Sequence, residues 1–291
     1  NDKRQQKKKG KGEGPPLQGG IRSAILKKNC EVIGMHELER QYHIACTEED
    51  VGRYCILPGD PGRVPAIAAL LDDARQVAYN REFCVWTGTL LGEKVTACST
   101  GIGGPSAAIA MEELIHCGAE CFVRTGTCGG MGKDVLGGDL VIANGAIRME
   151  GTGLQYAPIE FPAVADTGVI NALCEAARAD GCKYHVGVVH CKDSFYGQLD
   201  PDSMPVKDEL KSKWDAWCAC GALASEMESA TLYIVAAVRK VRIGTVLLVL
   251  GNQTRRALGL EDIQCHDTEQ SVKVAVDAIA RLIKKDKKEE K

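Results

Sequence analysis

Two arginines beside glycine-containing turns give the sequence candidate sites for an anion. Arg63 ends the turn Gly59-Asp60-Pro61-Gly62, which places a planar guanidinium next to free backbone N–H groups; an ordinary surface turn is the alternative. Arg124 lies inside the apolar run Cys121–Thr125, where a buried charge needs a partner. That partner is either an anion bound near Thr127 or a carboxylate of the protein itself.

Two other segments carry polar groups suited to a sugar and to a base. Ser225-Glu226-Met227-Glu228 opens an amphipathic segment, in which acids in the first turn would stabilise a helix through its dipole. Glu228 falls between core-facing neighbours, where its carboxylate can accept two hydrogen bonds from vicinal sugar hydroxyls. Gln198 matches the adjoining N–H and C=O of uracil, and Phe195 can stack on such a ring or simply cap the core.

A strand, a glycine turn and a helix are predicted in succession between Val95 and Leu114. Gly101, Gly103 and Gly104 can adopt positive φ, and Pro105 suits the first turn of a helix. Such a helix N-terminus can bind an anion, or the glycines can serve only to let helix and strand pack closely.

The remaining motifs and the charge exclude several classes of protein. The sequence lacks a Ser-His-Asp order, a His-Glu-x-x-His, a Walker sequence and a Gly-x-Gly-x-x-Gly, which argues against dehydrogenases, kinases and metalloproteases. A net charge of -3 and a pI near 6.1 argue against a general nucleic-acid binder. We find no run of eighteen apolar residues and no signal peptide, and expect a cytoplasmic protein with a small-molecule partner and no membrane association.

The fourteen cysteines are scattered and form no Cys-x-x-Cys pair. This distribution predicts reduced cysteines that serve as small core residues in a reducing compartment. A zinc site built from Cys218, Cys220 and either His190 or His266 is the alternative, and we expect no other metal site of this kind.

Short apolar runs alternate with amphipathic segments through most of the chain, which predicts an α/β fold with a mixed or parallel sheet. Strands are expected at 53–57, 95–100, 121–125, 140–146, 186–190 and 245–250, and helices at 64–71, 106–118, 171–180, 226–239 and 268–284. Residues 1–40 are expected to be a largely disordered Lys/Gly-rich extension, 41–284 one domain, and 285–291 a charged, frayed tail. Ligands in such folds gather at the carboxyl ends of strands.

Six segments, in this order along the chain, resemble the uridine phosphorylases of the nucleoside phosphorylase-I superfamily. They are Leu57–Arg63, Arg81-Glu82-Phe83, Ser99–Ser106, Arg124–Thr127, Phe195–Gln198 and Ser225–Ala230. The resemblance runs from about Gln41 to Ile283 and implies a single three-layer α/β/α domain with a central mixed β-sheet. It also implies reversible phosphorolysis of uridine, with deoxyuridine or thymidine as further substrates, to uracil and a pentose 1-phosphate, without an organic cofactor.

The resemblance implies a role for each matching residue. Phosphate, the co-substrate, would be held by Gly59, Arg63, Arg124 and Thr127, with Arg81 from a neighbouring subunit. Ribose would be bound by Glu228 and Met227, with His43 reaching across a dimer, and the base by Phe195, Gln198 and Gln253. A monovalent cation, K⁺, would lie at the dimer interface between Glu82, the Ile102 carbonyl and Ser106. Homodimers would assemble into a homohexamer.

Two departures from the family concern the base. Leu199-Asp200-Pro201 follows Gln198 where an arginine is often found, and Gln253 or Arg255 must replace a second arginine after the last strand. A purine nucleoside phosphorylase would share the phosphate and ribose sites, but its usual Asp is absent at Asn252 and Gln253. A nucleosidase, which uses water, would leave the arginines without a phosphate to bind. A non-catalytic nucleoside-binding protein on the same fold is a further alternative.

Overall fold

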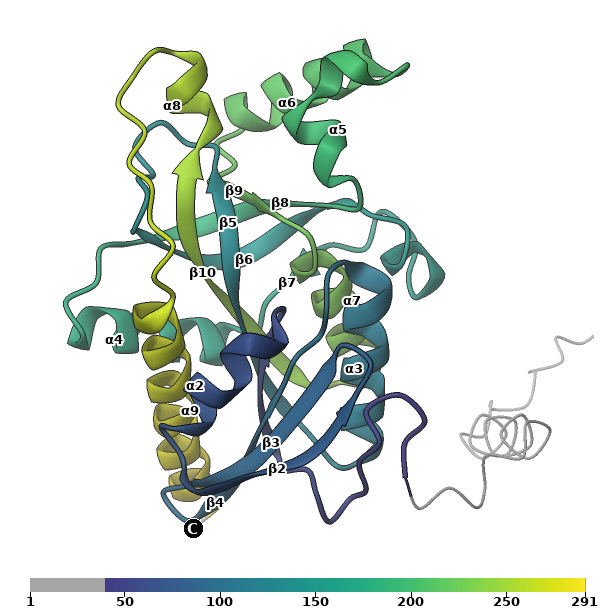
Figure 1. Cartoon of the computed structure of the whole chain (residues 1–291), viewed down its shortest axis with the longest axis vertical. Coiled ribbons are helices and arrows are strands. Elements are labelled where there is room, and N and C mark those ends of the chain that lie inside the picture. The colour runs from purple at the N-terminus through teal and green to yellow at the C-terminus, as the bar shows by residue number, and fades with distance from the viewer. Residues whose placement is uncertain (1–39, 291) are drawn as a thin grey trace, which may run out of the picture. The chain divides into compact units, whose positions relative to one another are not determined.

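Ten strands form one sheet in residues 40–290, the part of the chain that the computed structural model describes (Figure 1). The predicted extension 1–40 thus lies outside the described residues, except for Arg40. The strands are β1 Tyr54–Pro58, β2 Asp72–Asn80, β3 Phe83–Leu90, β4 Glu93–Cys98, β5 Cys121–Gly130, β6 Leu140–Met149, β7 Ala163–Val164, β8 Tyr184–Lys192, β9 Ala224–Glu226 and β10 Arg242–Asn252. The α-helices are α2 Val64–Ala68, α3 Gly104–His116, α4 Thr167–Ala179, α5 Phe195–Leu199, α6 Lys207–Ala219, α7 Ser229–Arg239, α8 Gln253–Ala257 and α9 Glu269–Glu289.

The sheet is mixed, as predicted. β1 pairs in parallel with β4 and β5, while β3 pairs antiparallel with both β2 and β4. β5 also pairs with β10 and β9, and the chain of pairings β5-β10-β6-β8-β9 returns to β5. This part of the sheet therefore closes on itself, and the carboxyl end of β5 pairs antiparallel with β9, beyond the point where β1 ends opposite Thr125.

The two-residue period of the strands divides the interior into two cores. In β1, Tyr54 and Ile56 pack in the core under α2, α4 and α9, whereas Cys55 and Leu57 pack with α3 and α7 on the other face. Figure 1 shows these helix groups on opposite faces of the sheet, so the predicted three-layer α/β/α arrangement is confirmed. Phe122 packs in the α3–α7 core, and the same alternation puts Arg124 on that face.

Several elements were not predicted because their sequences lack the expected burial pattern. β2 is largely exposed, so it has no apolar alternation, and it pairs with β3 as a hairpin. Helix α6 has no fully buried residue; its apolar side chains face a cavity described below. The helix predicted at 226–239 is present, but its predicted start was wrong: Glu226 ends β9 and α7 begins at Ser229, so neither Glu226 nor Glu228 lies in its first turn.

The C-terminal tail also differs from the prediction. Helix α9 continues to Glu289 instead of fraying from Lys284. Asp286 is buried and accepts hydrogen bonds from the Tyr54 hydroxyl at 2.8 Å and from Arg242 Nη1 and Nη2 at 3.0 and 2.5 Å. Burial disfavours the Asp286 carboxylate, but these hydrogen bonds outweigh burial and hold its pKa below the usual value. The C-terminal segment, although rich in charged residues, is thus anchored to the first residues of β1 and β10.

Replacement of this carboxylate should expose its contribution to stability. Asp286→Asn should lower the free energy of unfolding by about 2 kcal/mol at pH 7, because charge-assisted hydrogen bonds are lost. A pKa lowered by folding gives stability that is present above the unfolded pKa and is lost as the pH falls through the folded pKa. Urea denaturation should therefore show a difference that shrinks below about pH 4. Asp277→Asn on the same helix is the control. If Asp286→Asn lowered the free energy of unfolding equally at pH 7 and below about pH 4, the Asp286 carboxylate would not be the stabilising group.

Candidate functional site

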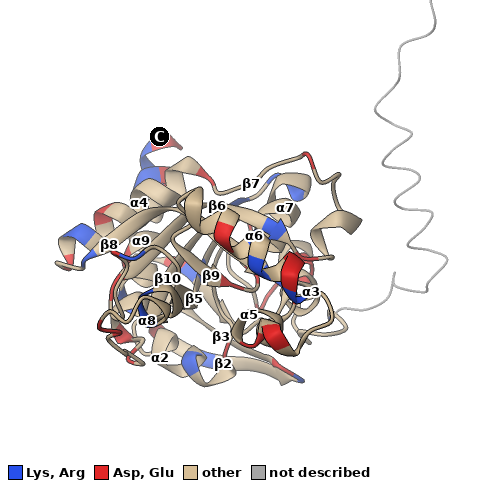
Figure 2. Ribbon diagram, turned by 90° about the horizontal axis from the view of Figure 1, so that it is seen from above, with Lys and Arg blue, Asp and Glu red and all other residues tan. Residues whose placement is uncertain are grey.

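A cavity of about 960 Å³ opens at the carboxyl ends of β1, β5 and β9, the edge at which ligand sites were predicted. It brings together most of the predicted phosphate, ribose and cation residues and one predicted base residue. These are Gly59, Arg63, Glu82, Ile102, Ser106, Arg124, Thr127, Phe195, Met227 and Glu228. Viewed onto this edge, Figure 2 shows acidic and basic residues intermixed along α6.

Arg124 is the most deeply buried cation of the cavity wall, with 3% of its surface exposed. Its guanidinium donates to Glu226 Oε2 at 3.2 Å and to Glu228 Oε2. Burial opposes the charge, but the two carboxylates outweigh it and raise the pKa of Arg124. Arg124 Nη1 is also buried and has no hydrogen-bond partner in the described residues. Glu226 and Glu228 are thus carboxylate partners of Arg124, and Nη1 has no hydrogen-bond partner within the described part of the chain.

Glu226 and Glu228 hold the guanidinium from two directions. Glu226 accepts the backbone N–H groups of Glu228 and Ser229, all at 3.0 Å, and thereby caps the start of α7. Glu228 Oε1 accepts the Gly103 N–H at 2.5 Å. Burial raises the pKa of Glu228, while Arg124 opposes the rise. The glycine turn before α3 does bind an anion, but in this structure that anion is the protein's own Glu228 carboxylate.

Two local features of the backbone keep the predicted anion residues in place. Asp60 accepts the Gly62 N–H at 2.8 Å and so shapes the turn that presents Arg63 to the cavity. Burial lowers the pKa of Arg63, and Asp60 partly offsets this. A Cβ at Gly126 would lie 3.0 Å from Arg124 Nη2, so glycine gives the guanidinium the space it occupies.

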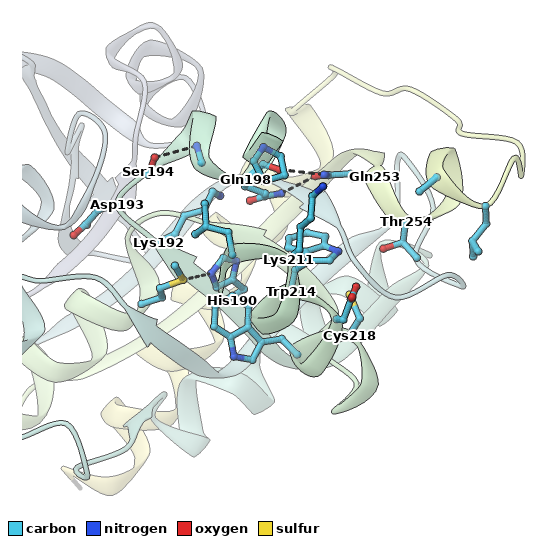
Figure 3. A pocket seen from close by; sticks show the side chains of 18 residues that line it. His190, Lys192, Asp193, Ser194, Gln198, Lys211, Trp214, Cys218, Gln253 and Thr254 are labelled. Atoms are coloured by element: carbon cyan, nitrogen blue, oxygen red, sulfur yellow. Dashed lines mark hydrogen bonds between the residues drawn. The ribbon is translucent and has the colours of Figure 1, made fainter. Parts of the chain in front are cut away.

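A second chamber, of about 650 Å³, adjoins the first and contains the predicted base residues Gln198 and Gln253 (Figure 3). Its walls are mostly apolar and include Trp214 from α6. Gln198 Nε2 donates to Gln253 Oε1 at 3.1 Å, and Gln253 Nε2 donates to the Gln198 carbonyl at 3.2 Å. Arg255 lines neither space, because its guanidinium binds the carbonyls of Glu261 and Lys133.

Lys192 lines both cavities, and sequence reasoning gave it no role. It ends β8, is 5% exposed, and donates to Ser225 Oγ at 2.8 Å. Burial lowers the pKa of Lys192, and Glu226 opposes this. The available signal was the same as for Arg124: a cation at the end of an apolar strand.

His43 and Arg81 do not line either cavity of this chain. His43 Nδ1 lies 2.6 Å from Glu113 Oε1, and Glu113 also accepts the N–H groups of His43 and Ile44. Arg81 lies in the turn of the β2–β3 hairpin with φ 55°. Of the predicted site residues, His43 and Arg81 thus lie apart from the rest, which line the first cavity or the second chamber.

The predicted cation residues all line the first cavity, and two of them, Glu82 and Ser106, are in contact. Ser106 Oγ lies 2.8 Å from Glu82 Oε1 and 2.5 Å from the Thr100 carbonyl oxygen, and Ile102 is 78% exposed. A hydrogen bond within Glu82 itself and one from Ser106 lower the pKa of Glu82. Carboxylate, hydroxyl and carbonyl oxygens are ligands that suit a hard monovalent ion.

The cysteines between residues 40 and 290 are free, and most are buried, which confirms the prediction that most of them are small core residues. Within the same range, no three His, Cys, Asp or Glu side chains are grouped so that they could hold a metal ion. Cys218 lies in the second chamber with His190, whereas Cys220 is exposed. Helices long and apolar enough to span a membrane are likewise not found there.

The buried ion cluster predicts a strong stability effect. Arg124→Leu should destabilise the protein by about 3–5 kcal/mol, because Glu226 and Glu228 lose their buried counter-charge. Adding Glu228→Gln to Arg124→Leu should restore part of this loss, although Glu228→Gln alone destabilises the wild type. Chemical denaturation of the four proteins measures the coupling. Additive losses would show that the two side chains do not depend on each other.

Comparison with known proteins places this geometry in a family. The model of the phosphorylase superfamily matches residues 53–285. The uridine phosphorylase of Treponema pallidum is 55% identical over 87% of this chain and 98% of its own length, and that of Klebsiella aerogenes is 40% identical over 83% and 98%. The guanosine phosphorylase of Halorubrum lacusprofundi is 41% identical over 74% and 85%. The match covers every residue that lines the first cavity and most of the chain, and the chain therefore belongs to the phosphorylase superfamily.

Proposed function

We propose that this protein is a uridine phosphorylase of pyrimidine salvage, a pentosyltransferase that uses phosphate to cleave uridine reversibly to uracil and ribose 1-phosphate. The observation that carries the proposal is the buried, unpartnered Nη1 of Arg124 in a cavity that also holds Arg63 and Glu228. An anion donor and a sugar acceptor thus lie side by side. The similarity to two uridine phosphorylases supports the choice of substrate.

Phosphate binds at the end of the cavity formed by Gly59, Arg63, Arg124 and Thr127. A phosphate oxygen attacks C1′ of the ribose, the C1′–N1 bond breaks, and its electron pair leaves with the uracil, which takes a proton from water. The transition state has oxocarbenium character, as in glycoside hydrolysis, so the phosphate is both nucleophile and counter-charge. The arginines orient the phosphate and offset its charge.

Glu228 accepts hydrogen bonds from the ribose hydroxyls, and Met227 packs against the sugar. The carboxylate is already held in place by Gly103 and Arg124, so it loses little freedom when the sugar binds. Because Glu228 is negative and close to C1′, it also favours the positive charge that develops on the ribose.

The base extends from the first cavity toward Gln198, with Phe195 beside the ring. Lys192 lies at the junction of the two cavities, where its ammonium group can stabilise the negative charge on the departing uracil. In this proposal, Lys192 compensates for the two base-site arginines that the sequence lacks. Gln253 supports Gln198 from behind.

The neighbourhood of Asn252 favours a pyrimidine over a purine. Its Nδ2 donates to the carbonyls of Gly132 and Val135, and its Oδ1 accepts the Arg255 N–H. Asn252 is fully buried and its side-chain amide is hydrogen-bonded to backbone groups, so it provides no hydrogen bond to a purine ring. Deoxyuridine and thymidine remain proposed substrates, since neither needs another polar group at this place.

The active unit is at least a homodimer, assembled into a homohexamer, in which His43 binds the 5′-hydroxyl and Arg81 the phosphate of the neighbouring subunit. Both lie outside their own chain's cavities. Tyr42, the neighbour of His43 in sequence, and Ile102 of the first cavity are exposed apolar side chains, which supports this role. Glu82, the Ile102 carbonyl and Ser106 would hold K⁺ at the interface, where the ion would tie the rim of the cavity to the neighbour. The free cysteines favour a reducing, cytoplasmic location.

The proposal is tested by incubating the protein with uridine, with and without phosphate, and measuring uracil and ribose 1-phosphate. We expect release of uracil only with phosphate. Release without phosphate would indicate a nucleosidase, faster cleavage of inosine than of uridine would indicate a purine enzyme, and nucleoside binding without cleavage would indicate a binding protein.

The role of Lys192 gives a separate prediction. Lys192→Met should lower kcat for uridine by about 100-fold, because a charge that acts on the leaving group is lost, and should change KM for phosphate little. Lys213→Met removes a similar but exposed amine, paired with Glu209, and is the control. A normal kcat in Lys192→Met would remove Lys192 from the proposed mechanism.

A further inference from the structure

The Ser225 hydroxyl is the centre of a hydrogen-bond network that joins the two cavities. Ser225 is 4% exposed and lies 2.7 Å from Gln198 Oε1, 2.8 Å from Lys192 Nζ and 3.0 Å from His190 Nδ1. Figure 3 shows Gln198, Lys192 and His190 converging on one side of the chamber, with Gln253 beside Gln198. Nothing in the phosphorolysis mechanism above requires Ser225 or His190.

The direction of the amides follows from a group that cannot turn over, the backbone carbonyl of Gln198. This oxygen accepts a hydrogen bond from Gln253 at 3.2 Å, so the atom that faces it must be Gln253 Nε2. Gln253 Oε1 then faces the Gln198 side chain at 3.1 Å, and only the Gln198 Nε2 can donate to it. Gln198 Oε1 consequently faces Ser225. Turning either amide over would set two oxygens against each other.

The other partners of Ser225 agree with this polarity. Its single proton goes to Gln198 Oε1, and Lys192, which has only protons to give, occupies one lone pair of the hydroxyl. Burial lowers the pKa of His190 to about 3, so the ring is neutral at pH 7. Its Nδ1–H fills the second lone pair, and the ring is fixed by stacking on Trp217 at 4.3 Å between centroids. All hydrogen-bonding positions of the Ser225 hydroxyl are therefore used.

We propose that Ser225 and Gln253 are positioning residues that lock the direction of the Gln198 amide, so that the site accepts uracil and rejects cytosine. This inference rests on the proposed contact of Gln198 with the base. The second lone pair of Gln198 Oε1 meets N3–H of uracil, and the second Nε2–H meets an adjacent carbonyl oxygen. Cytosine presents a bare N3 lone pair to Oε1, and the two acceptors repel each other.

A free glutamine would not discriminate in this way. Its amide can turn over at little cost and offer Nε2–H to N3 of cytosine and Oε1 to the exocyclic amine. Ser225 and Gln253 therefore hold the Gln198 amide in one of its two orientations, so that it recognises only the uracil edge. Cytosine is disfavoured by the penalty for unpaired or opposed polar groups.

The test uses the full-length protein and compares inhibition of uridine phosphorolysis by free uracil and free cytosine. In the wild type we expect uracil to inhibit far more strongly than cytosine. In Ser225→Ala and in Gln253→Ala the ratio of the two inhibition constants should fall by about tenfold or more, since the amide is free to turn. Ser225→Thr keeps the hydroxyl and should keep the ratio, and Ser203→Ala, an exposed serine of the same region, should leave both constants unchanged.

The outcomes separate this inference from the assignment of Gln198. A merely structural role for Ser225 or Gln253 would weaken both bases equally, and an unchanged ratio in both alanine variants would overturn the inference. Gln198→Ala tests the contact itself: we expect weaker uracil binding and a reduced ratio. If Gln198→Ala binds uracil as the wild type does, the contact of Gln198 with the base is wrong and the inference falls with it, whereas phosphate-dependent cleavage of uridine still stands.

Discussion

The buried ion cluster of Arg124, Glu226 and Glu228 is the interaction on which the site depends. It joins the middle of β5, the end of β9, the residue before α7 and the glycine turn before α3 through side chains that are 7% exposed or less. A buried charge is stable only when its partners are in place, so these four segments must meet if the domain is to fold. The same requirement brings Arg124 and Glu228, the proposed phosphate and ribose ligands, to one cavity.

The two ends of the site use different kinds of polarity. Charges dominate the proposed phosphate and ribose end, where the proposed reaction would move charge between phosphate, ribose and base. The base end relies on neutral amides, a hydroxyl and a neutral imidazole, with Lys192 at the boundary. Neutral hydrogen bonds are directional, which suits the recognition of a base edge, whereas a charge acts over distance and suits catalysis.

Much of the site could be predicted because buried charges and glycine turns are conspicuous in a sequence. Arg124 inside an apolar strand signalled a partner, although the residues alone could not choose between an anion and a carboxylate. The structure contains the carboxylates and also leaves Arg124 Nη1 without a partner among residues 40–290. Ser225 and His190 gave no comparable signal, because a serine or a histidine beside a strand is ordinary and its role depends on neighbours far away in the sequence.

The sequence by itself determined the α/β class, the core position of most cysteines and the family, since these depend on local periodicity and on motifs within short segments. Only the tertiary structure decided that the sheet closes through β5 and β10, that Asp286 is buried in a charged tail, and that Glu226 lies on a strand. It alone decided the direction of the Gln198 amide as well. The physical reason is common to all four: each is set by contacts between residues distant in the chain, and local propensity contains no information about such contacts.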